Sequence, residues 1–262
     1  MRTDVARLDL YNRRRLTIGY GIGMALYMLA IVVLYPAFKH STELNKLTSG
    51  NSSVAALLGV TGTLTSPAGW VDANAYANFV PLIMLLVTIG YGAAAVAGQN
   101  EDGTLCLLVA LAFARHTILR QKIGCMVIQA TIIAVTVAVC VYIGSAFEVA
   151  LNPWNIATAS LAVLALGIDL GLIALTLGIA TGNRGPAIGV ATAVAAVSYL
   201  VNSLAPVVHW LRPLRFASLF YWALGNDPLA RGVTPASFAV LAGVALVASL
   251  AARTAFRKFD VQ

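Results

Sequence analysis

The sequence predicts an all-α membrane protein with six transmembrane helices, a short cytoplasmic helix between the second and third, and interfacial helices on the outer side. The first observation is composition: 60% of the 262 residues are hydrophobic and 10% are charged, whereas soluble domains have about 25% charged residues. The second is the set of long apolar segments. The third is a shorter apolar segment that follows the second of them. One membrane domain accounts for residues 1–262.

The six predicted spans are each long enough to cross a bilayer, which takes about 20 apolar residues. Six spans place both termini on one side. Lys and Arg are enriched in cytoplasmic loops, and with cytoplasmic termini 12 of the 17 Lys and Arg residues fall on the cytoplasmic side. The sequence therefore predicts a multi-pass protein with both termini in the cytoplasm. The predicted spans cover residues 17–38, 76–98, 118–147, 156–181, 186–208 and 236–256.

Three segments outside the spans are longer than simple turns. Residues 1–16 are either an amphipathic cytoplasmic elbow or a disordered basic start that only anchors the topology, and the sequence leaves both open. Residues 39–75 and 209–235 are predicted to be extracytoplasmic. The second of these is dense in Trp, Phe and Tyr, which favour the membrane–water interface. We expect short helices at the outer leaflet in both of these extracytoplasmic segments.

Residues 99–117 form the most informative segment. An acidic turn, Glu101-Asp102-Gly103-Thr104, precedes the apolar segment Leu105–Ala114, and a basic cluster begins at Arg115. About ten helical residues rise only ~15 Å, half of a ~30 Å hydrocarbon core. The segment is therefore expected to be an interfacial helix, with acids at its N-terminus and bases at its C-terminus as the helix dipole favours. Such an element suits docking of a soluble partner.

Several kinds of chemistry lack their motifs. The chain has no G-x-x-x-x-G-K-[ST], H-E-x-x-H or G-x-S-x-G, so we expect no ATP hydrolysis, catalytic residue or metal in this chain. Its three cysteines show no C-x-x-C spacing and are interpreted as free. The net charge of +7 is assigned to topology and to anionic lipid rather than to nucleic acid.

Asp169 is the one acid inside a predicted span. A charge at the bilayer centre is costly, so it should face protein or water. On a helical wheel, Thr158 and Thr176 fall on its side. Either Asp169 lines a translocation path or binds a substrate cation, or it is a protonated or hydrogen-bonded acid inside the bundle. The opposite side forms a small-residue packing face that consists of Gly167, Gly171, Gly178 and Gly182.

At residues 97–122 the chain resembles the permease subunits of ABC type 2 exporters, particularly those of polyketide or anthracycline antibiotic efflux. Family members commonly show A-G-E-E-E-x-G-T-L-x-L-L-L-A-x-P-V-S-R there, and this chain departs at Gln99, Asn100 and residues 112–114. Weaker similarities are Ser66-Pro67-Ala68-Gly69-Trp70 before the second span and Thr181-Gly182-Asn183-Arg184 after the fourth. The matching residues are Ala97, Gly98, Glu101, Gly103, Thr104, Leu105, Leu107, Leu108, Arg115 and Lys122.

The resemblance implies a six-helix subunit that pairs with a second permease copy around a central path in a bacterial plasma membrane. Each copy would sit on a separate cytoplasmic ATPase subunit, which binds ATP and Mg, and the cargo would be hydrophobic or amphiphilic. Residues 99–117 would hold the coupling helix that contacts the ATPase. The residues that the resemblance assigns to this coupling are Glu101, Asp102, Gly103, Thr104, Leu105, Leu108 and Arg115.

Three other functions compete with this interpretation. A secondary transporter would use Asp169, although such proteins are expected to show paired, interrupted helices and the sequence shows no convincing internal repeat. A polytopic lipid-modifying enzyme would need a polar constellation at one membrane face. A purely structural membrane anchor would need neither. A neighbouring gene for a P-loop ATPase would separate the permease from all three.

Overall fold

A computed structural model describes residues 4–39, 66–103, 115–206, 208–225 and 227–258. Helices make up most of these residues, and no strand occurs among them. Among the described residues, six helical stretches are long and apolar enough to cross a membrane, so the prediction of a six-span, all-α membrane protein is confirmed at that level. They are Ala6–Phe38, Pro67–Glu101, His116–Phe147, Pro153–Thr181, Arg184–Leu204 and Pro235–Arg257.

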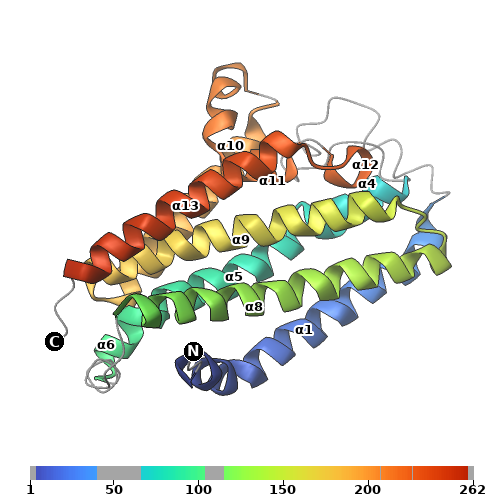
Figure 1. The fold of residues 1–262 in the computed structure, drawn as a ribbon. Helices are drawn as coiled ribbons and strands as arrows, with labels where there is room; N and C mark the ends of the chain where they lie inside the picture. Colours follow the sequence, from blue (N-terminus) through green and yellow to red (C-terminus); the bar gives the residue numbers. More distant parts are fainter. Residues whose placement is uncertain (1–3, 40–65, 104–114, 207, 226, 259–262) are drawn as a thin grey trace.

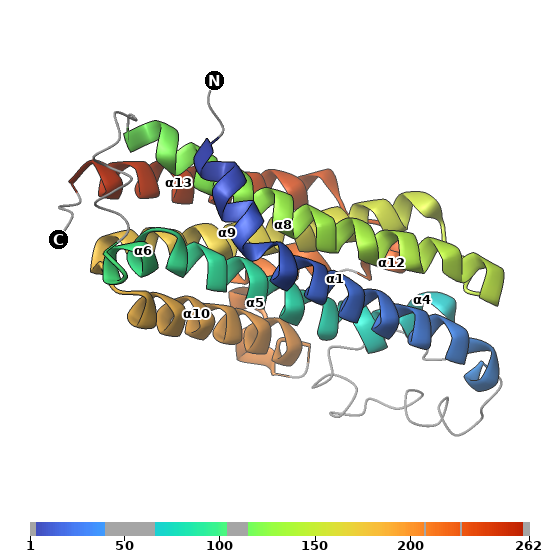
Figure 2. The same cartoon turned by 90° about the horizontal axis from the view of Figure 1, so that it is seen from below.

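The long helices lie side by side in an elongated bundle (Figures 1 and 2). Both termini lie at one end of it, together with α6 (Gln99–Glu101) and the starts of α8 (Arg115–Ile143) and α10 (Arg184–Leu204), and we call this the terminal end. The opposite end is the loop end. The principal helices are α1 (Asp4–Phe38), α5 (Phe79–Ala93), α8 (Arg115–Ile143), α9 (Pro153–Thr181), α10 (Arg184–Leu204) and α13 (Pro235–Lys258).

Helix α9 is the centre of the bundle and packs against α5, α8, α10 and α13. Its close approach to α5 depends on glycine: a methyl group added at Gly92 would lie 2.2 Å from the Gly171 carbonyl oxygen, and one added at Gly167 would lie 2.4 Å from Met84. A methyl group at Gly178 would lie 3.1 Å from the Ala93 carbonyl oxygen. The predicted small-residue packing face of α9 is therefore confirmed for Gly167, Gly171 and Gly178.

Gly182 does not belong to that packing face. It is the C-cap of α9, where its φ of 69° is left-handed and its N–H donates to the Gly178 carbonyl oxygen. Glycine adopts this conformation without the steric strain that a side chain brings. The placement of Gly182 on the packing face was wrong, because a helical wheel assumes that the helix continues through the residue that ends it.

Helices α1 and α8 run in the same direction. The Ala6 N–H donates to Gln121 Oε1 at 3.1 Å, Thr17 Oγ1 lies 3.4 Å from Gln129 Oε1, and Cys140 Sγ lies 3.9 Å from the Ala25 carbonyl oxygen. The sequence separations of these pairs stay between 112 and 115. A nearly constant separation means parallel helices, as expected for two spans with one span between them.

Most predicted span boundaries lie slightly inside the observed ones, and the largest differences are at the starts of the first and second spans and at the end of the fifth. Residues 4–16 extend α1, and its first turns (dark blue) run in a different direction from the rest in both views. The second span begins at Pro67, where Ser66 Oγ caps α4 (Pro67–Val71) by accepting the Gly69 N–H at 3.1 Å. The π-helical η1 (Asp72–Tyr76) continues toward α5. Helix α10 ends at Leu204, short of the predicted residue 208.

Short helices occur in residues 209–235, as expected. Ser218 Oγ caps α11 (Leu219–Leu224) by accepting the Tyr221 N–H at 3.3 Å, and the Tyr221 ring packs edge-on against the rings of Phe216 and Trp222. Their position at a membrane surface remains a prediction. These helices are η4 (His209–Leu211), η5 (Pro213–Ala217), α11 (Leu219–Leu224) and α12 (Pro228–Arg231).

Candidate functional site

The predicted coupling segment is described only at its flanks. On its N-terminal side, α6 (Gln99–Glu101) ends in Asp102 and Gly103. Gly103 has a left-handed φ of 68°, and its N–H donates to the Asn100 carbonyl oxygen at 3.1 Å, which ends the helix. On the C-terminal side, Arg115 begins α8. Thr104, Leu105 and Leu108 lie outside the described residues, and a coupling helix over residues 105–114 remains a prediction.

Glu101 binds the start of α10. Its Oε1 accepts the Arg184 backbone N–H at 2.7 Å, and its Oε2 lies 3.2 Å from Arg184 Nε. The first N–H groups of a helix lack partners within that helix, and a carboxylate there also suits the dipole. The chain itself thus occupies both oxygens of the acid that we expected to cap residues 105–114 and face a partner. The sequence offered one signal: Glu101 and Arg184 fall on the same predicted side.

A buried polar cluster at the terminal end escaped the sequence reasoning. Lys122 on α8 is fully buried, and its Nζ lies 3.3 Å from Asp9 Oδ2 and 2.8 Å from Gln99 Oε1. Asp9 also accepts the Tyr91 hydroxyl at 2.9 Å and Gln99 Nε2 at 3.4 Å. We call Asp9, Tyr91, Gln99 and Lys122 the terminal cluster. It joins α1, α5, α6 and α8.

A cleft of about 150 Å³ lies beside the terminal cluster. Arg13 and Arg184 contribute positive charge to its lining and Asp102 contributes negative charge, in addition to Asp9. The Arg13 guanidinium sits 4.9 Å from the centre of the Tyr91 ring, within the range of a cation–π contact. The mixed charges neutralise one another, so the lining does not select an anion or a cation.

Asp169 is fully buried in α9. Within the described part of the chain neither of its carboxyl oxygens has a hydrogen-bond partner. Thr158 Oγ1 donates to the Trp154 carbonyl oxygen at 3.0 Å, and Thr176 Oγ1 donates to that of Leu172 at 2.8 Å. Eleven and seven residues separate Thr158 and Thr176 from Asp169 along the helix, roughly 16 and 10 Å. The three residues share a helix face and do not meet in one site.

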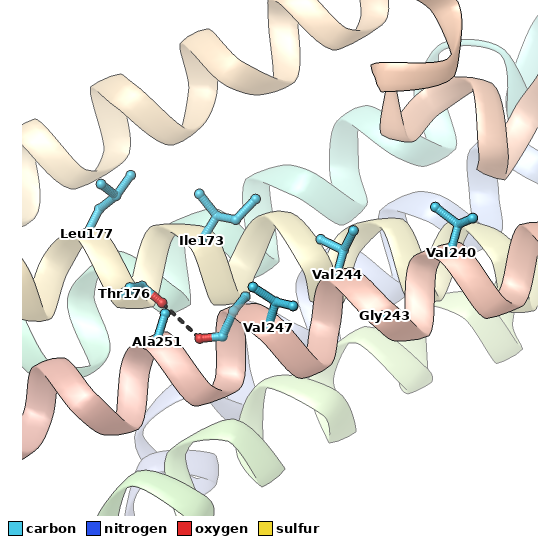
Figure 3. A pocket seen from close by; sticks show the side chains of 9 residues that line it. Ile173, Thr176, Leu177, Val240, Gly243, Val244, Val247 and Ala251 are labelled. Atoms are coloured by element: carbon cyan, nitrogen blue, oxygen red, sulfur yellow. Dashed lines mark hydrogen bonds between the residues drawn. The ribbon is translucent and has the colours of Figure 1, made fainter.

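Thr176 lines a groove of about 570 Å³ between α9 and α13. Figure 3 shows Ile173 and Leu177 of α9 beside Thr176, with Val240, Val244 and other residues of α13 across from them. The Thr176 hydroxyl points to the Ala248 carbonyl oxygen at 3.2 Å and links the two helices. Asp169 and Thr158 are not among the lining residues. The groove is apolar apart from that hydroxyl.

A second groove, of about 750 Å³, lies between α5 and α10. Its walls are apolar and include Leu82, Leu86 and Ala195, and Phe220 of α11 also lines it. Toward the loop end, the Tyr199 hydroxyl donates to Asn78 Oδ1 at 2.5 Å. The groove therefore pairs a long apolar surface with one polar pair. The sequence did not mark it, since Asn78 and Tyr199 are 121 residues apart.

Comparison with protein-family models finds no match to this chain. Comparison with curated proteins also finds no match. The functional assignment therefore depends on the residues and geometry described above.

Proposed function

We propose that this chain is the permease subunit of an ATP-driven ABC exporter for a hydrophobic or amphiphilic substrate. The resemblance at residues 97–122 supports it, and six helices able to span a membrane fit it. One observation carries the proposal furthest: both described flanks of residues 104–114 are fixed to other helices, through Glu101 to α10 and through Lys122 to α1. A segment that receives force from a partner needs such attachments.

The proposal assigns nucleotide chemistry to a partner. A cytoplasmic ATPase subunit would bind ATP and Mg, since this sequence has no phosphate-binding loop. It would contact residues 99–117, with Leu105 and Leu108 on the apolar part of the segment and Glu101, Asp102 and Arg115 at its ends. The terminal end of the bundle would then face the cytoplasm.

The groove between α5 and α10 is the best-supported wall for the substrate path. Ligand sites are mostly apolar and carry a few placed polar groups, and this groove combines apolar walls with the Asn78–Tyr199 pair. A second permease copy facing it would enclose a path between subunits. The composition of the walls suits an amphiphile with an uncharged polar group.

The mechanism follows from the helix contacts. ATP binding would close the ATPase subunits and displace residues 105–114. Helices α1 and α8 are parallel and linked by polar contacts at Ala6, Thr17 and Ala25, so they would move together as one rigid unit. That rotation would open the path between subunits toward the loop end.

Affinity purification of the tagged chain from its native membrane tests the proposal. The expected result is a co-purifying ATPase with a P-loop, in equal copy number, and the same preparation shows whether a second permease is present. A stable chain without a nucleotide-binding partner would overturn the proposal.

A secondary transporter is the second candidate, and one observation favours it. Asp169 is fully buried and lacks a hydrogen-bond partner in the described part of the chain, as a carboxyl reserved for a proton or cation would. This candidate predicts that substrate efflux persists without ATP, collapses with a protonophore, and is lost in Asp169→Asn. The permease proposal predicts the reverse dependence on ATP and on the protonophore.

A further inference from the structure

We propose that the terminal cluster is a polar joint that fixes the start of α1 to both flanks of residues 104–114. Asp9 and Lys122 are its positioning residues. The joint makes a displacement at either flank reach α1 directly. The inference rests on the proposed function only for the source of that displacement, which would be the ATPase. The contacts that define the joint do not depend on the proposed function.

Both flanks of residues 104–114 converge on one carboxylate, that of Asp9. Gln99 belongs to α6, before the segment, and Lys122 belongs to α8, after it. Gln99 Nε2 and Lys122 Nζ both bond Asp9, and Lys122 Nζ also bonds Gln99 Oε1 at 2.8 Å. A movement of one flank therefore strains its bond to the other flank and to α1 at once.

Two further hydrogen bonds hold the same turn of α1 against α8. The Ala6 N–H, near the N-terminus of the helix, donates to Gln121 Oε1 at 3.1 Å, and the Cys125 thiol donates to the Ala6 carbonyl oxygen at 3.3 Å. Together with Lys122, these contacts hold the α1 start by three positions of α8. Cys125 is buried under that start, so its exposure reports detachment of α1.

The polar bonds of the joint give it a defined geometry. A buried ion pair adds little stability compared with an apolar pair of similar volume, but it demands a defined geometry. Lys122 has no exposed surface and Asp9 very little, so an apolar pair would fill this space as well. The directional bonds fix the rotation and depth of α1, which packing alone leaves free to slide.

The helix that carries Tyr91 and Gln99 also departs from α geometry between them. Residues Ala94–Gly98 form the π-helical turn η2. π-Helical turns occur frequently at functional sites. Here η2 lies directly between two residues that both bond Asp9, so the irregular turn is part of the joint.

The test measures the maleimide labelling rate of Cys125 in the full chain in lipid nanodiscs. Cys106→Ser and Cys140→Ser leave Cys125 as the single thiol, because the chain has three cysteines. We expect Asp9→Asn and Lys122→Gln each to raise the rate at least tenfold. The exchange Asp9→Lys with Lys122→Asp should return it to within threefold of the parent. Arg120→Gln, at an exposed position of the same helix, is the control and should change nothing.

Linkage between the flanks is tested from the other side of the segment. Gln99→Leu removes the α6 contacts and should raise the Cys125 rate at least threefold, whereas His116→Gln, at an exposed position of α8, should not. Parental rates in Asp9→Asn, Lys122→Gln and Gln99→Leu would overturn the joint.

Loss of folding in a single variant does not decide the matter, so the double variant Asp9→Leu with Lys122→Met is measured as well. It should keep the parental gel-filtration profile and helical circular dichroism and still label faster. A folded double variant with the parental rate would overturn the joint. Labelling uses neither ATPase nor substrate, so its failure is distinct from a failure to find an ATPase by purification.

Discussion

Asp9 and Asp169 are both buried acids in helices of this bundle, and their surroundings differ completely. Asp9 meets Lys122, Tyr91 and Gln99 from three other helical segments. Asp169 sits in the middle of α9, and its oxygens have no hydrogen-bond partner in the described part of the chain. The comparison shows that a buried acid near the end of a span serves to connect helices here. The acid in mid-helix is enclosed by packing alone.

The two faces of α9 explain the isolation of Asp169. Gly167 and Gly171 let α5 approach closely on one face. On the other, Thr176 lies roughly 10 Å from Asp169 along the helix, and its hydroxyl donates to the Leu172 and Ala248 carbonyl oxygens. Thr158 and Thr176 make this side of α9 polar in composition, and their hydroxyls donate to backbone carbonyl oxygens.

Removing the ion-pair partner of Asp9 should have the largest effect on stability. Lys122→Met leaves Asp9 buried opposite an apolar side chain, and removing one member of a buried ion pair destabilises by about 3–5 kcal/mol. The free energy of unfolding in lipid–detergent micelles measures it. Arg120→Met on the exposed side of α8 is the control and should change little. A Lys122→Met variant as stable as the control would show that Asp9 does not depend on the pair.

The close contact between α5 and the glycine face of α9, opposite Asp169, can be broken from α5. Gly92→Ala places a methyl group 2.2 Å from the Gly171 carbonyl oxygen, a contact with backbone that rotamer changes cannot relieve. We expect a loss of about 3 kcal/mol in unfolding free energy, at the upper end of overpacking effects. Gly90→Ala is a matched control, because nothing lies within 4 Å of the added methyl group. Equal stability of the two variants would refute the close α5–α9 contact.

A pair of equivalent substitutions compares the two acids directly. Asp9→Asn removes the charge opposite Lys122 and should lower the unfolding free energy by about 2 kcal/mol, the scale of a charged hydrogen bond. Asp169→Asn conserves volume and breaks no hydrogen bond within the described part of the chain, so its effect should stay below about 1 kcal/mol. Urea or dodecyl sulfate titration followed by circular dichroism measures both. A larger effect at Asp169 would reverse the comparison.

A small effect is expected at the half-exposed contact between α6 and α10. Glu101→Ala removes the acceptor of the Arg184 N–H and should lower the unfolding free energy by about 1 kcal/mol, as for other helix caps. Arg184→Gln keeps that N–H and loses only an ion pair with an exposed partner, which should cost less. The same titration separates the two. A larger loss in Arg184→Gln would mean that the side-chain pair, not the cap, carries the contact.

The sequence predicted what periodicity and composition control. The six spans and the glycine face of α9 follow from apolar length and from residue spacing along one helix. The short helices at residues 209–235 were also expected. Such features need no knowledge of which helices are neighbours.

The terminal cluster could not be predicted in the same way. Asp9 and Lys122 are 113 residues apart, and both stand beside basic residues near span ends, where charged side chains normally reach water. Glu101 was assigned to the segment that follows it, because local spacing favours a local partner, whereas α10 provides the actual contact. Asp169 was noticed because it is the lone acid of its span, yet rarity along the chain did not reveal its surroundings.

The most direct test of the central claim is photo-crosslinking from residues 104–114 in native membranes. A benzoylphenylalanine at position 108 should crosslink to a P-loop ATPase, identified by mass spectrometry, because the proposed function places the coupling contact there. The control is the same photoprobe at Trp210, which is exposed, belongs to the segment predicted to be extracytoplasmic, and should give no such product. Crosslinks from position 108 only to lipid, or to an ATPase equally from position 210, would contradict the account.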